Sequence, residues 1–190
     1  MTGRIAARTS VSPTRSALLF ALLTIGEFAG LVGWLRLANS ESWLWGMLLL
    51  CAGFLIERFT ARTLLQVPFA LLPFLGITVS EIFIWMAWLE IANRIWIVAG
   101  PILLLATMLV QHSVEMSILS KQRPLTYIRD VPTVVFTAAE AAGGVAWADL
   151  TRKGHPVAGA LLLLAALTIE HLLQGARLRR DMSAATAAMW

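Results

Sequence analysis

Six apolar stretches fill almost the whole chain, and most of them approach the ~20 residues that a helix needs to cross the hydrocarbon core of a bilayer. They cover about residues 16–38, 43–59, 67–92, 95–119, 131–150 and 157–176. Only 14% of the residues are charged, compared with about 25% in soluble domains. The sequence therefore predicts an all-α integral membrane protein: a single domain, residues 1–190, of six transmembrane helices, with nothing left over for a soluble domain.

The first apolar stretch is similar to a secretory signal peptide only at its start. Arg4, Arg8 and Arg15 precede it, as basic residues precede a signal peptide. However, the stretch is long, it contains Glu27, and no small-residue cleavage site follows a short apolar core. We therefore expect it to be retained as the first helix.

The basic residues indicate the orientation in the membrane. With the N-terminus in the cytoplasm, 11 of the 15 basic residues fall on the inner side and four on the outer side. The outer four are Arg36, Arg94, Arg152 and Lys153. This bias predicts a multi-pass inner-membrane protein with both termini in the cytoplasm. The positive net charge follows from that orientation, and no basic stripe with interleaved aromatic residues indicates a nucleic-acid partner.

Three of the stretches share a pattern in which a glutamate is followed by a tryptophan seven residues later and by a charged residue nine residues later. The copies are Glu27, Trp34 and Arg36; Glu81, Trp88 and Glu90; and Glu140, Trp147 and Asp149. Each copy is followed by a second apolar stretch that carries another acid. We expect three helical-hairpin repeats, about 16–59, 67–119 and 131–176, arranged with pseudo-threefold symmetry about the membrane normal.

The acids of the second stretches nearly keep this register. Glu57 and Glu170 each follow the first glutamate of their hairpin by 30 residues, whereas Gln111 stands at that position in the middle hairpin and Glu115 comes one helical turn later. A carboxylate at mid-membrane costs ~2.5–3.5 kcal/mol on insertion scales and usually marks a functional site. We therefore expect all six glutamates to form one cluster that binds a cation, either a proton or a divalent metal ion, and that passes it across the membrane if the protein is a transporter.

Two histidines keep a metal-dependent enzyme open as an alternative. His112 shares a helix face with Glu115, and His171 follows Glu170. Carboxylates with two histidines are the ligand inventory of two-metal sites in helical bundles, although the usual Glu-x-x-His order is missing here. A haem held by both histidines is the less favoured option. Because histidines occur in only two hairpins, we interpret them as standing outside the repeat and expect the glutamates to carry the function.

The tryptophans of the repeat have two interpretations. Trp34, Trp88 and Trp147 lie about two turns from the repeated glutamates on the same helix face, where they could form a lid. Alternatively, they belong to an aromatic belt at the outer membrane interface. That belt would also include Trp43, Trp45, Trp85 and Trp96.

A third class of function involves neither transport nor catalysis by this chain. In an accessory subunit, the intramembrane acids would pair with basic residues of a partner membrane protein or of a second copy of the chain. The single cysteine, Cys51, excludes an intrachain disulfide, and no phosphate-binding or hydrolase motif is present. The sequence leaves the transporter, enzyme and subunit hypotheses open.

Overall fold

The computed structural model describes residues 12–38, 42–65, 70–94, 99–120 and 122–187, and the regular elements of this part are all helices. They are α1 (Pro13–Ala38), α2 (Trp43–Leu65), α3 (Leu71–Arg94), α4 (Ala99–Ser120), α5 (Pro124–Ile128), α6 (Val131–Arg152) and α7 (Pro156–Ala187). All except α5 are long and apolar enough to cross a membrane. The described chain is therefore a multi-pass membrane protein whose outer surface contacts lipid.

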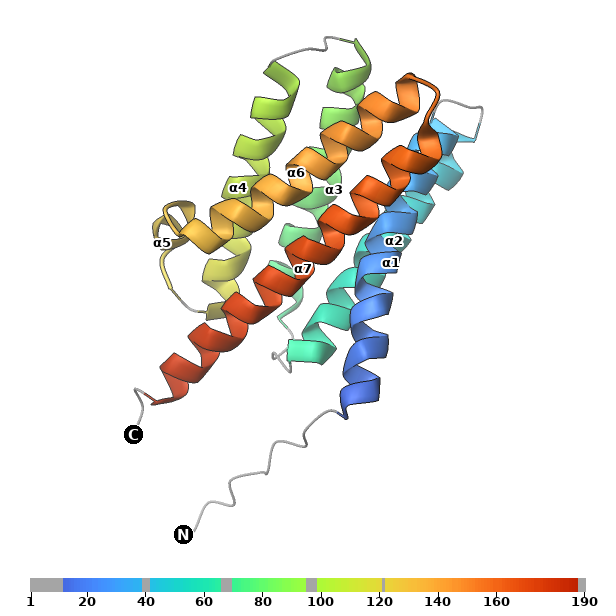
Figure 1. Ribbon diagram of the computed structural model, residues 1–190. Helices are drawn as coiled ribbons and strands as arrows, with labels where there is room; N and C mark the ends of the chain where they lie inside the picture. Colours follow the sequence, from blue (N-terminus) through green and yellow to red (C-terminus); the bar gives the residue numbers. More distant parts are fainter. Residues whose placement is uncertain (1–11, 39–41, 66–69, 95–98, 121, 188–190) are drawn as a thin grey trace.

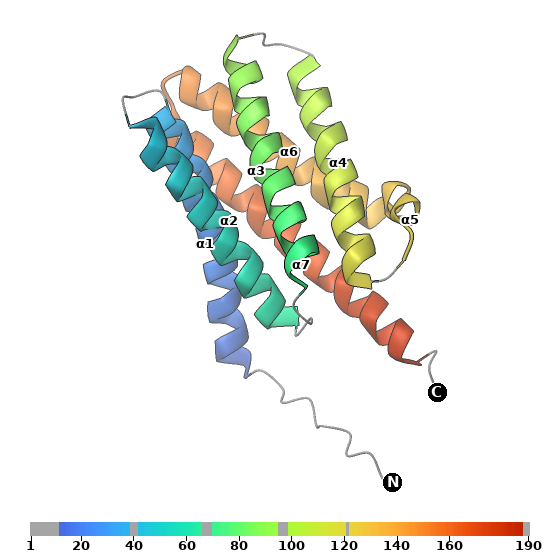
Figure 2. The same cartoon turned by 180° about the vertical axis from the view of Figure 1, so that it is seen from behind.

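Consecutive long helices pack as pairs, α1 with α2, α3 with α4, and α6 with α7. Neighbouring pairs meet through α2 and α3, through α4 and α6, and through α7 and α1. In Figure 1, α1 begins and α7 ends at the same end of the bundle, while α3 and α4 lie behind α6 and α7. Figure 2 shows the reverse side, where α3 and α4 face the viewer. The six predicted spans are confirmed, and the structure leaves the pseudo-threefold repeat as a prediction.

Two helices extend beyond their predicted spans, and one helix was missed. Helix α2 continues past residue 59 to Leu65, and α7 continues past residue 176 to Ala187. In α2 the polar residues Glu57 and Arg58 are buried inside the bundle, so they do not mark the membrane boundary. The short helix α5 lies outside the membrane-spanning helices, where an apolar pattern gives no signal for it.

Glycines hold two of the helix pairs together at close range. A Cβ at Gly53 of α2 would lie 2.4 Å from the carbonyl oxygen of Gly26 in α1. A Cβ at Gly143 of α6 would lie 2.2 Å from the Cβ of Ala166 in α7. Any side chain there would push the backbones apart, so these contacts require glycine. By contrast, a Cβ at Gly76 of α3 would meet nothing within 4 Å.

The repeated tryptophans lie in the core. Trp34, Trp88 and Trp147 are buried with Trp85 in one hydrophobic cluster, to which α1, α2, α3, α4, α6 and α7 all contribute. The aromatic-belt interpretation is therefore wrong for these four residues, because an interfacial anchor presents its ring to lipid. Other members of the predicted belt are exposed, namely Trp43 and Trp45, and Trp96 lies outside the described residues.

An ion-pair network joins α5, α6 and α7 at the end of the bundle where α1 begins and α7 ends. Asp130 caps α6 by accepting from the backbone N–H of Thr133 at 3.2 Å, and Arg177 of α7 donates to both of its oxygens at 3.1 and 3.2 Å. Burial would raise the pKa of Asp130, but the hydrogen bonds from Arg177 and Thr133 outweigh it and hold that pKa below its usual value. Arg177 also contacts Asp181. The hydroxyl of Tyr127 donates to Asp181 at 2.7 Å. Burial raises the pKa of Tyr127 to about 12.

Candidate cation-binding site

The six intramembrane glutamates all point into the bundle. Their exposed fractions lie between 1% and 5%. They are Glu27, Glu57, Glu81, Glu115, Glu140 and Glu170. Arg58, Gln111, His112 and His171 are buried with them. A carboxylate that faces the bundle interior needs a proton, a metal ion or a basic side chain beside it, because isolated burial of its charge costs several kcal/mol.

Arg58 supplies the cation for three of these carboxylates. Its guanidinium contacts Glu57 of its own helix, with Nε 3.1 Å from Oε2. It also donates to Glu81 of α3 and to Glu115 of α4. Gln111 of α4 adds a hydrogen bond from Nε2 to Glu81 at 3.3 Å. Arg58 thus joins three helices through ion pairs with carboxylates that α2, α3 and α4 turn inward.

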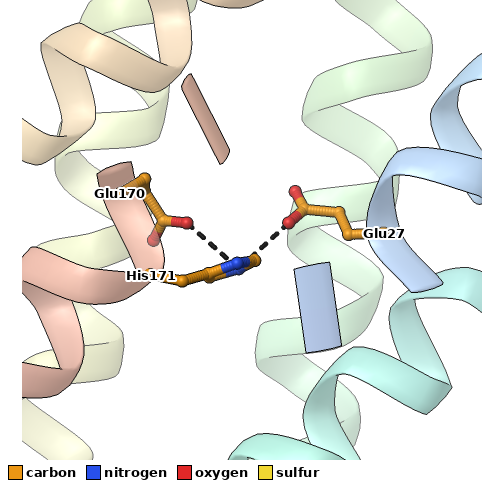
Figure 3. Close-up of side chains that lie close together, drawn as sticks. All are labelled: Glu27, Glu170 and His171. Atoms are coloured by element: carbon orange, nitrogen blue, oxygen red, sulfur yellow. Dashed lines mark ion pairs between the residues drawn. The ribbon is translucent and has the colours of Figure 1, made fainter. Parts of the chain in front are cut away.

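A second group lies between α1 and α7 and contains no arginine. Figure 3 shows the ring of His171 between the carboxylates of Glu27 and Glu170. Its Nε2 is 3.1 Å from Oε2 of Glu27 and 3.0 Å from Oε2 of Glu170. Its Nδ1 lies 3.0 Å from the hydroxyl of Thr24. One imidazole nitrogen therefore faces two acids, while the other is held by a threonine.

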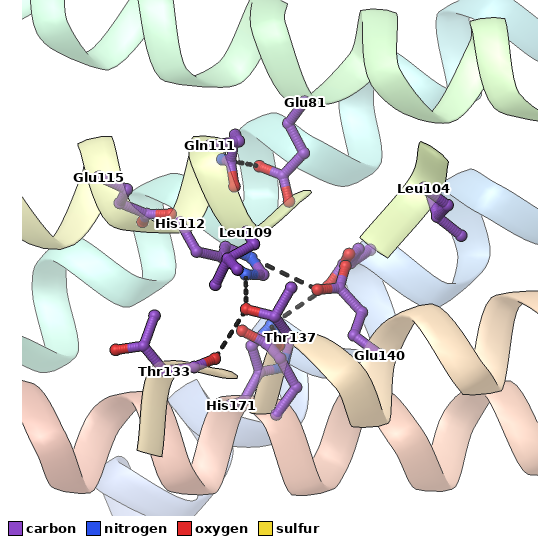
Figure 4. Close-up of polar contacts among 12 residues, drawn as sticks. Glu81, Leu104, Leu109, Gln111, His112, Glu115, Thr133, Thr137, Glu140 and His171 are labelled. Carbon is purple, nitrogen blue, oxygen red and sulfur yellow. Dashed lines mark hydrogen bonds and ion pairs between the residues drawn. The ribbon is translucent and has the colours of Figure 1, made fainter. Parts of the chain in front are cut away.

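A third group joins α3, α4 and α6. His112 Nε2 lies 3.3 Å from Oε2 of Glu140, and one carboxylate oxygen of Glu81 lies within 4.8 Å of the ligand atoms of both residues. His112 Nδ1 lies 2.9 Å from the hydroxyl of Thr137. Figure 4 shows these side chains converging from the three helices. Glu81 belongs to this group and also to the Arg58 network, so the two are contiguous.

The hydrogen bonds of Thr137 define the tautomer of His112. The Thr137 hydroxyl donates its proton to the carbonyl oxygen of Thr133 at 2.8 Å, so it must accept from Nδ1 of His112. In a neutral ring, Nε2 then presents a lone pair to Glu140. Oε2 of Glu140 has no hydrogen-bond partner within the described residues. A lone pair and a carboxylate repel each other, so a proton or a metal ion belongs between them.

Both histidine groups have the donor set of a metal centre. Each offers one imidazole nitrogen and two carboxylate oxygens, and these atoms lie within 4.8 Å of one another. The ligand atoms of a tetrahedral zinc ion are roughly 3.4 Å apart, close to the observed nitrogen–oxygen separations. In each group a threonine hydroxyl contacts Nδ1 and fixes the orientation of the ring, as hydrogen-bond partners of metal-binding histidines do. Three protein ligands would leave a fourth position open.

Sequence reasoning missed two signals that these contacts expose. Arg58, His112 and His171 each stand 31 residues after the first glutamate of their hairpin, so the histidines share a register and are not outside the pattern. Threonine also precedes each of these glutamates by three residues, at Thr24, Thr78 and Thr137. Counting from Glu27, Glu81 and Glu140 would have revealed both.

Comparison with protein-family models, curated proteins and solved structures gave no match to this chain.

Proposed function

We propose that this protein binds divalent metal ions within the membrane, at two groups that each contain one histidine and two glutamates. The α1–α7 group consists of Glu27, Glu170 and His171. The α3–α4–α6 group consists of Glu81, Glu140 and His112. Because each group has one imidazole, we expect the histidines to be as important for metal binding as the glutamates. The sequence had suggested a smaller role for the histidines.

The observation that carries this proposal is the contrast with Arg58. Arg58 stands at the same position in its hairpin as the two histidines do in theirs. It carries a permanent positive charge and contacts carboxylates from three helices. His112 and His171 bring no permanent charge to comparable sets of buried carboxylates. A metal ion would supply the positive charge that Arg58 supplies in its own group.

The proposal includes the threefold repeat of hairpins. Each second helix sends its basic or imidazole side chain to the first glutamate of the next hairpin. The contacts are Arg58 with Glu81, His112 with Glu140, and His171 with Glu27. These contacts follow one direction around the bundle, and the helix contacts between hairpins follow the same order. Both observations support a pseudo-threefold arrangement. In it, Glu57 and Glu115 are ion-pair partners of Arg58.

We further propose that the protein lies in the inner membrane with both termini in the cytoplasm and with Trp34, Trp88 and Trp147 closing the outer side of the polar groups. The distribution of basic residues and the burial of the three rings support this orientation and lid. In cells whose Cys51 has been replaced, a membrane-impermeant thiol reagent should label a cysteine at Lys153 and spare one at Gln122. The reverse labelling pattern would refute the orientation.

Proton binding is the second candidate, and one observation favours it. The separations of 3.0–3.3 Å between Nε2 and the carboxylate oxygens are also those of hydrogen bonds. A proton shared within each group would neutralise part of the charge without a metal. Transport, metalloenzyme and accessory-subunit roles all require one of these two occupants or a partner's basic side chain.

Elemental analysis of the purified protein after equilibration with Zn²⁺ or Mn²⁺ tests the proposal. We expect two metal ions per chain. His171→Gln and Glu27→Gln should each remove one ion, and His112→Gln and Glu140→Gln should each remove the other. Each change preserves approximate volume and removes a ligand, so the fold should persist.

Two exposed residues provide matched controls. His155→Gln, in the turn between α6 and α7, and Glu90→Gln, near the end of α3, should leave the metal content unchanged. A wild-type protein that retains no more metal than the double variant His112→Gln/His171→Gln would contradict metal binding. An infrared band of a buried protonated carboxyl group that Glu140→Gln removes would then support the proton alternative.

A further inference from the structure

The two histidine groups differ at the residue that precedes the histidine. In the α1–α7 group this residue is Glu170, whose Oε2 lies 3.0 Å from Nε2 of His171 (Figure 3). In the α3–α4–α6 group it is Gln111, a neutral amide in front of His112. Both residues follow the first glutamate of their hairpin by 30 positions. The α3–α4–α6 group therefore lacks a carboxylate at this position and takes its second carboxylate from Glu81.

That second carboxylate already has two hydrogen-bond donors. Oε2 of Glu81 accepts from Arg58 of α2 and, at 3.3 Å, from Nε2 of Gln111 (Figure 4). The carboxylates of the α1–α7 group, by contrast, form their ion pairs with His171. The charge of Arg58 also acts on Glu27, but within the described residues these two side chains form no ion pair. The α3–α4–α6 group thus shares a ligand with a permanent cation.

A metal ion and a hydrogen-bond donor compete for the same lone pairs of Glu81. Coordination through Oε2 would require the carboxylate to lose or share its bonds from Arg58 and Gln111, and outer partners of this kind change metal affinity by roughly 10–100-fold. If Oε1 were the ligand, the same bonds would still reduce the negative charge that it offers. Glu57 and Glu115 balance the charge of Arg58. The weakening therefore comes from competition for Glu81 and not from overall repulsion by the guanidinium.

We infer that the two groups bind metal with unequal affinity: the α1–α7 group fills first, and Arg58 and Gln111 keep the α3–α4–α6 group weaker by about tenfold or more. The inference rests on the proposed metal binding and adds the order of loading. At metal concentrations between the two dissociation constants, the chain holds one ion, in the α1–α7 group. The α3–α4–α6 group is then the one whose occupancy responds to the metal supply.

Titration of the metal-free, detergent-solubilised protein with Mn²⁺ tests the order of loading, with free Mn²⁺ measured by electron paramagnetic resonance. We expect two binding steps. His171→Gln should remove the tighter step, and His112→Gln should remove the weaker one. Two steps of equal affinity, or loss of the tighter step in His112→Gln, would overturn the inference and leave the proposed function intact. A wild-type protein that binds no Mn²⁺ would overturn both.

Substitutions of Gln111, which is not a proposed ligand, test the cause of the weaker binding. Gln111→Glu supplies the missing carboxylate and should strengthen the weaker step by roughly tenfold or more, since metal affinity rises with the number of charged ligands. Gln111→Leu removes one donor from Glu81 and should strengthen the same step by roughly threefold. Neither change should alter the tighter step, and a general disturbance of the fold would alter both.

Gln122→Glu is the matched control, because it adds the same charge at an exposed position, and it should leave both steps unchanged. A weaker step that Gln111→Leu leaves unchanged, or weakens further, would contradict competition for Glu81.

Discussion

Arg58 and Arg177 each contact more than one carboxylate, and their surroundings differ. Arg58 contacts Glu57, Glu81 and Glu115 in the interior and is 7% exposed. Arg177 contacts Asp130 and Asp181 at the end of the bundle, where its side chain is 20% exposed. Both contact more than one carboxylate, but the side chains of Arg177 and Asp130 are 20% and 16% exposed, whereas every side chain of the Arg58 network is at most 7% exposed. The same chemical pairing should therefore have very different energetic weight in the two places.

The difference follows from solvent. Removing one member of a buried ion pair leaves a charge without compensation and costs ~3–5 kcal/mol. Near water, the remaining charge is hydrated and screened, and exposed pairs contribute only ~0.2–1 kcal/mol. We therefore expect Arg58 to be essential for the stability of the bundle interior and Arg177 to make a smaller contribution to stability at the end of the bundle.

The largest effect is expected from Arg58→Leu. The change leaves three buried carboxylates without their cation, so the free energy of unfolding should fall by ~3–5 kcal/mol. Denaturation of the detergent-solubilised protein would measure it. Combining the change with Glu57→Gln, Glu81→Gln and Glu115→Gln should recover part of the loss, because the uncompensated charges are gone. Arg36→Leu, at an exposed position near the end of α1, is the control. A loss no larger for Arg58→Leu than for Arg36→Leu would remove the distinction between the two arginines.

A smaller effect is expected from Arg177→Leu. Asp130 keeps access to water, so the loss in the free energy of unfolding should be about 1 kcal/mol and should shrink as salt is added. The same denaturation experiment, run at low and high ionic strength, measures both quantities. If the loss matched that of Arg58→Leu and did not respond to salt, the bundle end would have to be as dry as the interior.

The smallest effect is a pH dependence at the bundle end. Because the pKa of Asp130 is lower in the folded protein than in the unfolded chain, its contribution to stability is complete above the unfolded pKa and is lost as the pH falls through the folded one. The protection factors of residues 130–134 against hydrogen exchange should therefore fall under acidic conditions, by an amount that corresponds to less than about 1 kcal/mol. Asp130→Asn should remove this acid dependence. Exchange that is equally acid-sensitive in the variant would assign the effect to another group.

Much of the fold could be predicted from the sequence because lipid imposes a simple rule on helix length and polarity. The six spans follow from apolar runs, and the burial of all six glutamates agrees with the cost of exposing a carboxylate to lipid. The ends of α2 and α7 were missed because the charged residues there pack inward or continue the helix beyond the membrane. The tryptophans were ambiguous because a ring near a helix end fits either a lipid interface or a packed core.

The partners of each ionisable residue could not be predicted in the same way. Arg58 stands beside Glu57 in the sequence, yet its other carboxylates come from α3 and α4. Which helices are neighbours depends on packing contacts such as the close approach of Gly53 and Gly26, and a single sequence does not reveal those pairings. The shared register of Arg58, His112 and His171 was nevertheless visible in the residue numbers, and counting 31 residues from each glutamate would have linked them.

The spread of the polar partners along the chain has a consequence for biosynthesis. In sequential insertion, Arg58 enters the membrane before Glu81 and Glu115 do, and Glu57 beside it is an acid that can accompany it at that stage. The α1–α7 group is completed last, since Thr24 and His171 are 147 residues apart. A nascent chain that stops before α7 would contain the arginine network and the ligands on α3, α4 and α6, while Glu27 would still lack its histidine. Glu27 therefore remains without its histidine partner until the final helix has been inserted.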